Sequence, residues 1–261
     1  MNLLTYKLGA NVCAFSTTRE GGVSQGAYST FSICDYCGDE TTHVHSNRAT
    51  LCKHLNIKDN QLILPHQSHT TNVAIVRESD IANGTRFTDT DALITNVKNC
   101  CIGISTADCV PLLLYDPHAE CIAAIHAGWR GTVNRIAEKT IRSMQEVYGS
   151  LPNHILAIIG PSISEPAFEV GDEVYETFQA AHFNMEEIAH RYPALNGQTK
   201  WHIDLWKANA HQLLNMGIPA AQIQNPGICT YTAHNNFFSA RRLGIRSGRI
   251  YTGILMKELT T

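Results

Sequence analysis

The sequence predicts an α+β fold in which a mixed β-sheet is flanked by helices, because three observations coincide. Hydrophobic residues make up 44% of the 261 residues and charged residues 16%, which is typical of a chain with a substantial apolar core. Apolar segments of strand length occur in clusters along the chain. Amphipathic helical segments lie between these clusters without strict alternation, which disfavours a doubly wound parallel sheet.

The predicted strands are short apolar segments bounded by polar or turn residues. They comprise residues 12–17, 62–64, 73–76, 92–95, 102–105, 112–115, 121–125 and 155–159. The first of these leads into a turn-rich segment with three glycines at residues 19–26.

The hydrophobic period changes from strand to helix after residue 126. Apolar residues from Val133 to Val147 recur at intervals of three and four, which places them on one face of a helix that Gly149 would end. Residues 44–55, 171–181 and 205–216 are also predicted to be helical. Residues 237–249 are polar, basic and glycine-containing, which predicts a loop at the surface or at a site.

Composition excludes several classes of protein. The formal net charge is −3 and no block of Lys or Arg dominates, so no nucleic-acid partner is expected. No apolar segment approaches the about 20 residues of a membrane span, and the first residues do not resemble a signal peptide. We therefore expect a cytoplasmic protein. The nine cysteines, an odd number, are expected to be reduced thiols, including Cys34 and Cys37.

Three segments place a metal-binding or nucleophilic side chain at the end of a predicted strand. They carry His69, Cys109 and His126, and ends of strands are where functional groups usually lie. After His126 two glycines allow a tight turn into a helix, whose free N–H groups, together with Arg130, could hold an anion. Spacing alone does not show that the three segments meet. The motifs of nicotinamide-binding proteins, P-loop proteins, zincins and α/β-hydrolases are absent.

Motifs along nearly the whole chain resemble those of the YfiH family, also described as the laccase-domain family. The most specific are ADC at residues 107–109 and HAGWRG at residues 126–131. Others are FSTTREGGVS at 15–24, NR at 47–48, QSH at 67–69, DALIT at 91–95, GPSI at 160–163, FEVG at 168–171, DLW at 204–206, CT at 229–230, and FFS at 237–239 followed by RR at 241–242.

The resemblance implies one domain over residues 1–261, a mixed-sheet α/β sandwich with flanking helices, and one zinc ion. The zinc ligands would be His69, Cys109 and His126. Three protein ligands leave the fourth tetrahedral position open for water or substrate, and the pKa of the water would fall to about 7. The chain departs from the family at residues 164–168, where many members carry a Cys pair, and at Thr70, where Gly is common.

The activity that the resemblance implies is purine nucleoside chemistry. It comprises phosphorolysis of adenosine, inosine, guanosine and S-methyl-5′-thioadenosine, and deamination of adenosine. The expected partners are therefore a nucleoside and phosphate, with no protein partner. Cys109 and Asp108 are expected to be catalytic. Asp108 would act either as a general acid/base or as a residue that orients a metal ligand. Arg48 and Arg130 are expected to bind phosphate, and Gln67 and Asp91 to contact the base or ribose.

Three alternatives stay open at this point. A copper polyphenol oxidase is one, since two His and one Cys also form blue-copper sites and copper is expected to bind in vitro. A trinuclear copper cluster, however, needs several H-x-H motifs, whereas the chain has one at residues 43–45. The second is an amide hydrolase that edits peptidoglycan precursors. The third is a structural zinc, which would need a fourth ligand that the sequence does not offer.

Overall fold

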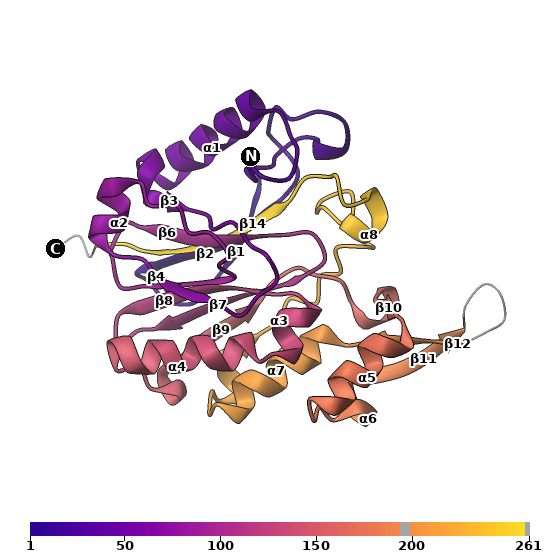
Figure 1. Cartoon of the computed structure of the whole chain (residues 1–261). Coiled ribbons are helices and arrows are strands. Elements are labelled where there is room, and N and C mark those ends of the chain that lie inside the picture. Colours follow the sequence, from indigo (N-terminus) through magenta and orange to yellow (C-terminus); the bar gives the residue numbers. More distant parts are fainter. Residues whose placement is uncertain (194–198, 259–261) are drawn as a thin grey trace.

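Two mixed β-sheets lie face to face in the centre of the computed structural model, which describes residues 1–193 and 199–258 (Figure 1). The five-stranded sheet has the order β1 (Leu3–Tyr6), β2 (Val12–Thr17), β14 (Ile250–Met256), β6 (Cys101–Thr106), β3 (Leu62–Ile63). The six-stranded sheet has the order β13 (Ile223–Gln224), β9 (Leu156–Ile159), β7 (Val110–Asp116), β8 (Cys121–Ala127), β5 (Ala92–Thr95), β4 (Val73–Ile75). Parallel pairs occur at β3–β6, β4–β5 and β13–β9, and the other neighbours are antiparallel.

The core between the sheets is formed by alternate residues of the central strands. Ile102 and Ile104 of β6 and Ile254 of β14 pack there against Leu113 of β7 and Ala124 of β8, and all five are buried. Because side chains alternate across a strand, the intervening residues face the outer layers. Burial on both faces explains why these strands are continuous apolar segments in the sequence.

Helices cover the outer face of each sheet (Figure 1). Leu51 of α1 (Thr41–Leu55) belongs to a buried cluster with Phe15 and Tyr251 of the five-stranded sheet. Helices α3 (Trp129–Val133), α4 (Ile136–Tyr148) and α7 (Leu205–Asn215) cover the six-stranded sheet. The layers are therefore helix, sheet, sheet and helix, which confirms the predicted mixed-sheet sandwich with flanking helices.

A small three-stranded sheet lies beside this sandwich (Figure 1). Its order is β10 (Glu169–Val170), β12 (Thr199–Ile203), β11 (Ala189–Pro193), and α5 (Asp172–Ala180) and α6 (Met185–Ile188) lie next to it. The remaining α-helices are α2 (Glu78–Asn83) and α8 (Ala240–Leu243). The longest described helix, α1, has 15 residues, and none of the described helices is long and apolar enough to cross a membrane.

Three expectations about the fold need correction. The strand β14 was not expected, although it lies in the middle of the five-stranded sheet. The helical periodicity from Val133 is interrupted, because Arg135 has a φ of 63° and α4 begins after it. The disulfide between Cys34 and Cys37 contradicts the expectation of reduced thiols at these positions. A turn at residues 35–38 brings their Cα atoms to 5.7 Å, while the other seven cysteines are free.

Asp116 is a buried carboxylate at the end of β7 that fixes two loops. It accepts hydrogen bonds from the backbone N–H groups of His118 and Ala119 at 2.8 and 3.0 Å, and from the hydroxyl of Ser150 at 2.6 Å and the N–H of Leu151 at 3.1 Å. Burial opposes ionisation, but the hydrogen bond from Ser150 and those from the backbone outweigh it and lower the pKa of Asp116.

Candidate metal centre

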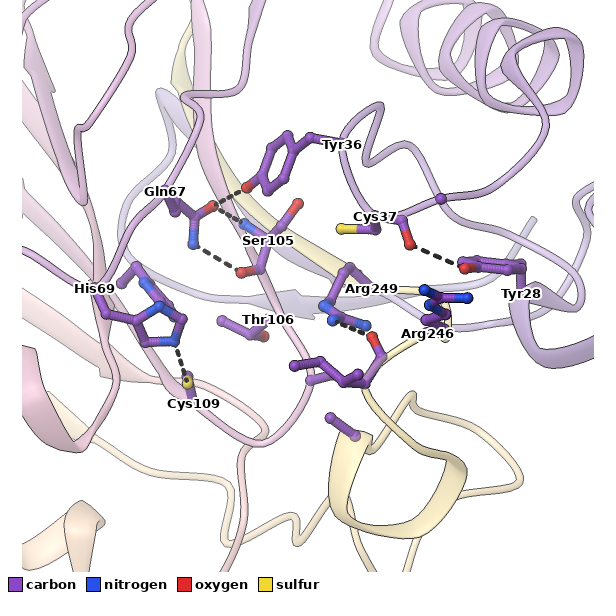
Figure 2. A pocket seen from close by; sticks show the side chains of 15 residues that line it. Tyr28, Tyr36, Cys37, Gln67, His69, Ser105, Thr106, Cys109, Arg246 and Arg249 are labelled. Atoms are coloured by element: carbon purple, nitrogen blue, oxygen red, sulfur yellow. Dashed lines mark hydrogen bonds between the residues drawn. The ribbon is translucent and has the colours of Figure 1, made fainter.

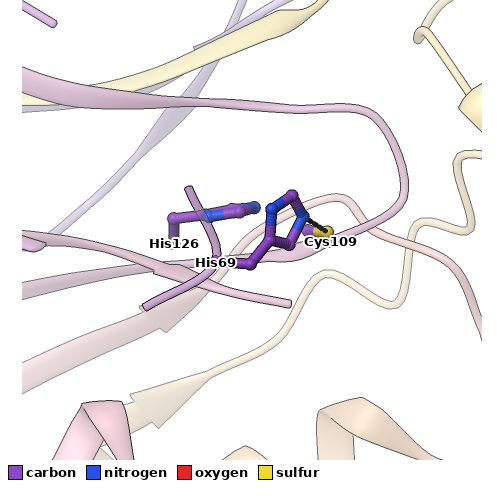
Figure 3. A group of neighbouring side chains, drawn as sticks. All are labelled: His69, Cys109 and His126. Carbon is purple, nitrogen blue, oxygen red and sulfur yellow. Dashed lines mark hydrogen bonds between the residues drawn. The ribbon is translucent and has the colours of Figure 1, made fainter. Parts of the chain in front are cut away.

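Three side chains from separate segments converge at one end of the sheets (Figure 3). His69 lies in the loop after β3, Cys109 in the turn between β6 and β7, and His126 near the end of β8. One nitrogen of each histidine and the Cys109 sulfur all lie within 4.8 Å of one another, so the group could hold a metal ion. His69 is exposed, Cys109 is half-buried and His126 is buried, which leaves one side of the group accessible.

The carboxylate of Asp91 orients the two histidines. Asp91 is fully buried directly before β5, and its Oδ1 accepts a hydrogen bond from Nδ1 of His126 at 2.7 Å. The backbone N–H of His69 donates to Oδ1 at 3.1 Å, and that of Thr70 donates to Oδ2 at 2.7 Å. This arrangement places the proton of His126 on Nδ1 and leaves Nε2 free for a metal.

The hydrogen bonds of Asp91 also make it an anion. Burial raises its pKa, but the hydrogen bond and the charge of His126, together with the hydrogen bonds of Thr70, lower it to about 2. We expected Asp91 to contact the base or ribose. In the structure its carboxylate binds the two histidine-bearing segments, and a contact with the base or ribose stays a prediction.

The electrostatics of the group favour a thiolate at Cys109. Burial raises the pKa of Cys109, but the charge of His126 and the hydrogen bonds of His126 and His69 lower it to about 6. Burial lowers the pKa of His126, but the charge of Cys109 and the hydrogen bond to Asp91 raise it. Because thiolate rather than thiol binds metals, Cys109 is suited to the role of a ligand.

Gly128 leaves the space beside the three donors free. A Cβ atom at this position would lie 3.0 Å from Sγ of Cys109 and 3.0 Å from Cδ2 of His69. The donor set and this space both fit a tetrahedral ion such as zinc, which takes thiolate and imidazole ligands. Within the described residues, the group contains no fourth His, Cys, Asp or Glu donor.

The three side chains line a cavity of about 690 Å³ (Figure 2). Its size falls in the range of about 300–1,000 Å³ that is typical of small-molecule sites. The other lining residues are Tyr28, Tyr36, Cys37, Gly38, Gln67, Ser105, Thr106, Ala107, Ala240, Ile245, Arg246 and Arg249. The segment of residues 237–249 therefore contributes to this cavity, although it was expected to be a loop throughout and contains the helix α8.

Gln67 lies in this cavity, as expected for a substrate contact. Its Oε1 accepts hydrogen bonds from the N–H of Ser105 at 2.7 Å and from the hydroxyl of Tyr36 at 3.3 Å, and its Nε2 donates to the carbonyl of Ser105 at 2.9 Å. An amide nitrogen carries two N–H donors, so one remains for a ligand.

The other predicted site residues do not line this cavity. Arg48 faces a separate cavity beside α1, where its Nε donates to Asp59 at 2.6 Å. Arg130 is exposed, and its guanidinium lies 4.4 Å from the ring centroid of Trp129. The carboxylate of Asp108 accepts hydrogen bonds from the hydroxyl of Thr230 and from the N–H of Arg241, both at 2.7 Å.

Comparison with known proteins places the chain in a family. Residues 13–257 match the family described as multi-copper polyphenol oxidoreductase laccase. The chain belongs to this family. A purine nucleoside phosphorylase of Bacteroides thetaiotaomicron is 44% identical over 254 residues, which cover 95% of the chain and 93% of that protein. Adenosine deaminase RL5, from an unknown prokaryotic organism, is 44% identical over 249 residues, which cover 94% of each.

A crystal structure within the family has the same fold. The YfiH protein of Bacillus licheniformis superimposes with a TM-score of 0.91 at 29% identity, and the match covers 98% of the chain and 96% of that protein. The resemblance to the YfiH family is therefore confirmed. The family description mentions several copper ions. Within residues 1–193 and 199–258, however, one group of three or more His, Cys, Asp or Glu side chains has metal-binding geometry.

Proposed function

We propose that this chain is a zinc-dependent purine nucleoside enzyme. It catalyses phosphorolysis of adenosine, inosine, guanosine and S-methyl-5′-thioadenosine, and deamination of adenosine. The observation that carries the proposal is the group of His69, Cys109 and His126 in the wall of a cavity large enough for a nucleoside. Relatives with 44% identity are named for each of the two reactions, which supports the same pair of reactions here.

The metal would be held by His69, Cys109 and His126, and a bound zinc ion supplies a Lewis acid and a nucleophilic water at neutral pH. Asp91 keeps the proton of His126 on Nδ1 and so presents Nε2 to the ion. The low pKa of Cys109 keeps its sulfur anionic at neutral pH. The open side of the group leaves room for the reacting atoms of a substrate.

The two reactions differ in the bond that breaks. In deamination, water adds to C6 of adenosine and the bond between C6 and the amino nitrogen breaks. The leaving amino group takes one proton of the water and departs as ammonia, while the other proton stays on N1 of inosine, whose C6 becomes a carbonyl. In phosphorolysis, an oxygen of HPO₄²⁻ bonds to C1′ of the ribose as the bond from C1′ to N9 breaks. The electron pair of that bond stays on the base, which takes up the proton of the phosphate.

Gln67 is assigned to contact with the substrate, and Asp108 to the positioning of Cys109. The free N–H of Gln67 points to a contact with the nucleoside. For Asp108 two roles were open, and its hydrogen bonds to Thr230 and Arg241 favour the positioning of Cys109, the next residue, over acid/base catalysis.

The alternatives have less support from the described residues. The two histidines of the motif at residues 43–45 lie on α1 and do not join the group around Cys109, so a trinuclear copper cluster lacks its ligands. A structural zinc needs a fourth protein donor, and the group has three. An amide hydrolase would use the same metal chemistry, so only a test of substrates distinguishes it from a nucleoside enzyme.

The test uses purified protein expressed without added copper. Adenosine and inosine are incubated with and without phosphate, and inosine, adenine and hypoxanthine are followed by liquid chromatography, while mass spectrometry measures the metal. We expect zinc at one equivalent, inosine from adenosine without phosphate, and free base only with phosphate. Cys109→Ala should abolish both reactions. Cys13→Ala, at another half-buried free cysteine, is the matched control.

Three results would contradict the proposal. One is the absence of turnover of every nucleoside by the zinc-loaded protein. Another is turnover that persists in Cys109→Ala, because the chemistry would then not depend on the metal group. The third is release of an amino acid from a peptidoglycan precursor by a protein that leaves nucleosides unchanged, which would favour the amide hydrolase.

A further inference from the structure

Two buried hydroxyl groups in the cavity have no hydrogen-bond partner. Ser105 and Thr106 end strand β6 and line the cavity beside the metal group, with exposed fractions of 5% and 1%. Within the described residues, neither Oγ of Ser105 nor Oγ1 of Thr106 forms a hydrogen bond. Buried polar atoms are paired in most proteins because an unpaired one destabilises the fold. These hydroxyls are therefore available to a ligand.

A guanidinium group lines the same cavity as these hydroxyls. Arg249 directly precedes Ile250, which pairs with Thr106 in the antiparallel register of β14 and β6. Its side chain is half-buried and lines the same cavity, and Figure 2 shows it in the wall of that cavity together with Ser105 and Thr106.

The charge of Arg249 has no anionic partner among the described residues. Its Nη1 donates to the carbonyls of Ser247 and Gly248 at 2.6 and 3.0 Å, and its Nη2 donates to that of Ile245 at 2.8 Å. These hydrogen bonds hold the guanidinium in place without neutralising it, and burial lowers its pKa. An unpaired cation in a cavity wall attracts an anion.

We propose that Ser105, Thr106 and Arg249 form an oxyanion subsite that binds inorganic phosphate, the second substrate of phosphorolysis. Hydroxyl and guanidinium groups both donate hydrogen bonds to phosphate oxygens, and those of a guanidinium are strengthened by its charge. The subsite adjoins the metal group, so phosphate bound there lies in the same cavity as the nucleoside. The inference rests on the proposed function, because it assigns the phosphate site of that reaction.

This assignment replaces the expectation that Arg48 and Arg130 bind phosphate. Arg48 already pairs with Asp59 in another cavity, and Arg130 is exposed outside the lining of this one. Arg249 differs from both because it is in the cavity and lacks a carboxylate partner within the described residues.

The test measures initial rates of inosine phosphorolysis by the metal-loaded enzyme over a range of phosphate concentrations. Arg249→Gln should raise KM for phosphate about 10- to 100-fold, and Thr106→Val about 3- to 10-fold, from the usual contributions of charged and neutral hydrogen bonds. In both variants the increase in KM for phosphate should exceed any change in KM for the nucleoside. Arg249→Lys should recover part of the loss, and Arg142→Gln, on the exposed side of α4, controls for net charge.

Calorimetric titration of the same proteins with inorganic phosphate and with adenosine 5′-monophosphate identifies the source of the oxyanion. We expect phosphate to bind the wild-type enzyme and to bind Arg249→Gln at least tenfold more weakly. The assignment to inorganic phosphate would be overturned if adenosine 5′-monophosphate bound in an Arg249-dependent way and inorganic phosphate did not bind. If Arg249→Gln does not fold, as judged by circular dichroism, Thr106→Val provides the measurement.

The outcomes for the subsite and for the proposed function can be told apart. Wild-type phosphorolysis combined with an unchanged KM for phosphate in Arg249→Gln and Thr106→Val refutes the subsite and leaves the function intact. A wild-type enzyme that cleaves no nucleoside refutes the phosphorolysis. In that case calorimetry still tests the subsite, because the proposal requires phosphate to bind Arg249→Gln more weakly than the wild-type enzyme.

Discussion

Replacing Gly128 by alanine tests the geometry of the metal centre with one added methyl group. The backbone at Gly128 has φ −64° and ψ 169°, which alanine adopts without strain, so the effect arises from contact alone. The new Cβ would lie 3.0 Å from Sγ of Cys109 and from Cδ2 of His69. Optimal contacts of this kind are about 3.5–4.0 Å, so one or both side chains must move by several tenths of an ångström.

The expected loss of metal affinity follows from that displacement. Distances from zinc to its ligands are about 2.0–2.3 Å and tolerate only about 0.2 Å of change. A misplaced ligand typically lowers metal affinity about 10- to 100-fold. We therefore expect the dissociation constant for zinc in Gly128→Ala to rise by this factor, which corresponds to about 1.4–2.7 kcal/mol.

The assay is a competition titration against a chromophoric chelator at pH 7. Gly131→Ala is the matched control, because its Cβ would meet no atom closer than 3.4 Å and alanine is favourable in a helix. Melting temperatures of the metal-free proteins show whether either variant disturbs the fold. An unchanged affinity in Gly128→Ala, or an equal loss in Gly131→Ala, would refute the steric argument.

Three further perturbations have defined outcomes. Asp91→Asn removes the charge that orients His126 and should weaken zinc binding about 10- to 100-fold in the same titration; equal affinity would argue against this role. Asp116→Asn should lower the free energy of unfolding by about 1–3 kcal/mol at pH 7. Because the pKa of Asp116 is depressed on folding, its contribution is complete above the unfolded pKa of about 3.9 and is lost as pH falls through the folded value. The difference in urea denaturation between wild type and Asp116→Asn should therefore shrink as the pH falls below about 4, and a constant difference would contradict the sign. The Cys34–Cys37 disulfide closes a loop of only four residues, so its reduction should lower the free energy of unfolding by about 2 kcal/mol. The same denaturation with and without a dithiol measures this loss, and a larger loss would show that more of the fold than this loop depends on the disulfide.

The elements that were predicted correctly are those specified by local pattern. Strands such as β5, β7 and β8 are continuous apolar segments, and α4 has a regular apolar face. The strand β14 was missed because Thr252 and Gly253 interrupt its apolar residues and a basic loop precedes it. In the fold, Gly253 faces Phe15 and Tyr251, whose rings occupy the space of a side chain. That packing is a tertiary contact that periodicity does not encode.

At the site, the family motifs predicted which side chains meet, while their roles stay predictions. The meeting of His69, Cys109 and His126 followed from the resemblance and not from their spacing. The hydrogen-bond and ion-pair partners of a polar side chain depend on tertiary structure. The sequence therefore did not predict the surroundings of Asp91 and Arg48. Asp91 is fully enclosed, and Arg48 is bound by a carboxylate beside α1. Residues 237–249 were predicted to be a loop at the surface or at a site, but no single residue could be chosen from it, because the place of Arg249 in the cavity depends on the pairing of β14 with β6.

The position of β14 between β2 and β6 has a consequence for synthesis on the ribosome. Among the described strands, β1 and β2 precede all others in the chain, yet their partner strand β14 at residues 250–256 follows all others. At about 5–20 residues per second, the edge of β2 waits roughly 10–50 s for that partner. During this interval the nascent chain exposes an unpaired strand edge, which other chains can join. A chaperone that shields this edge during translation should therefore raise the yield of active enzyme.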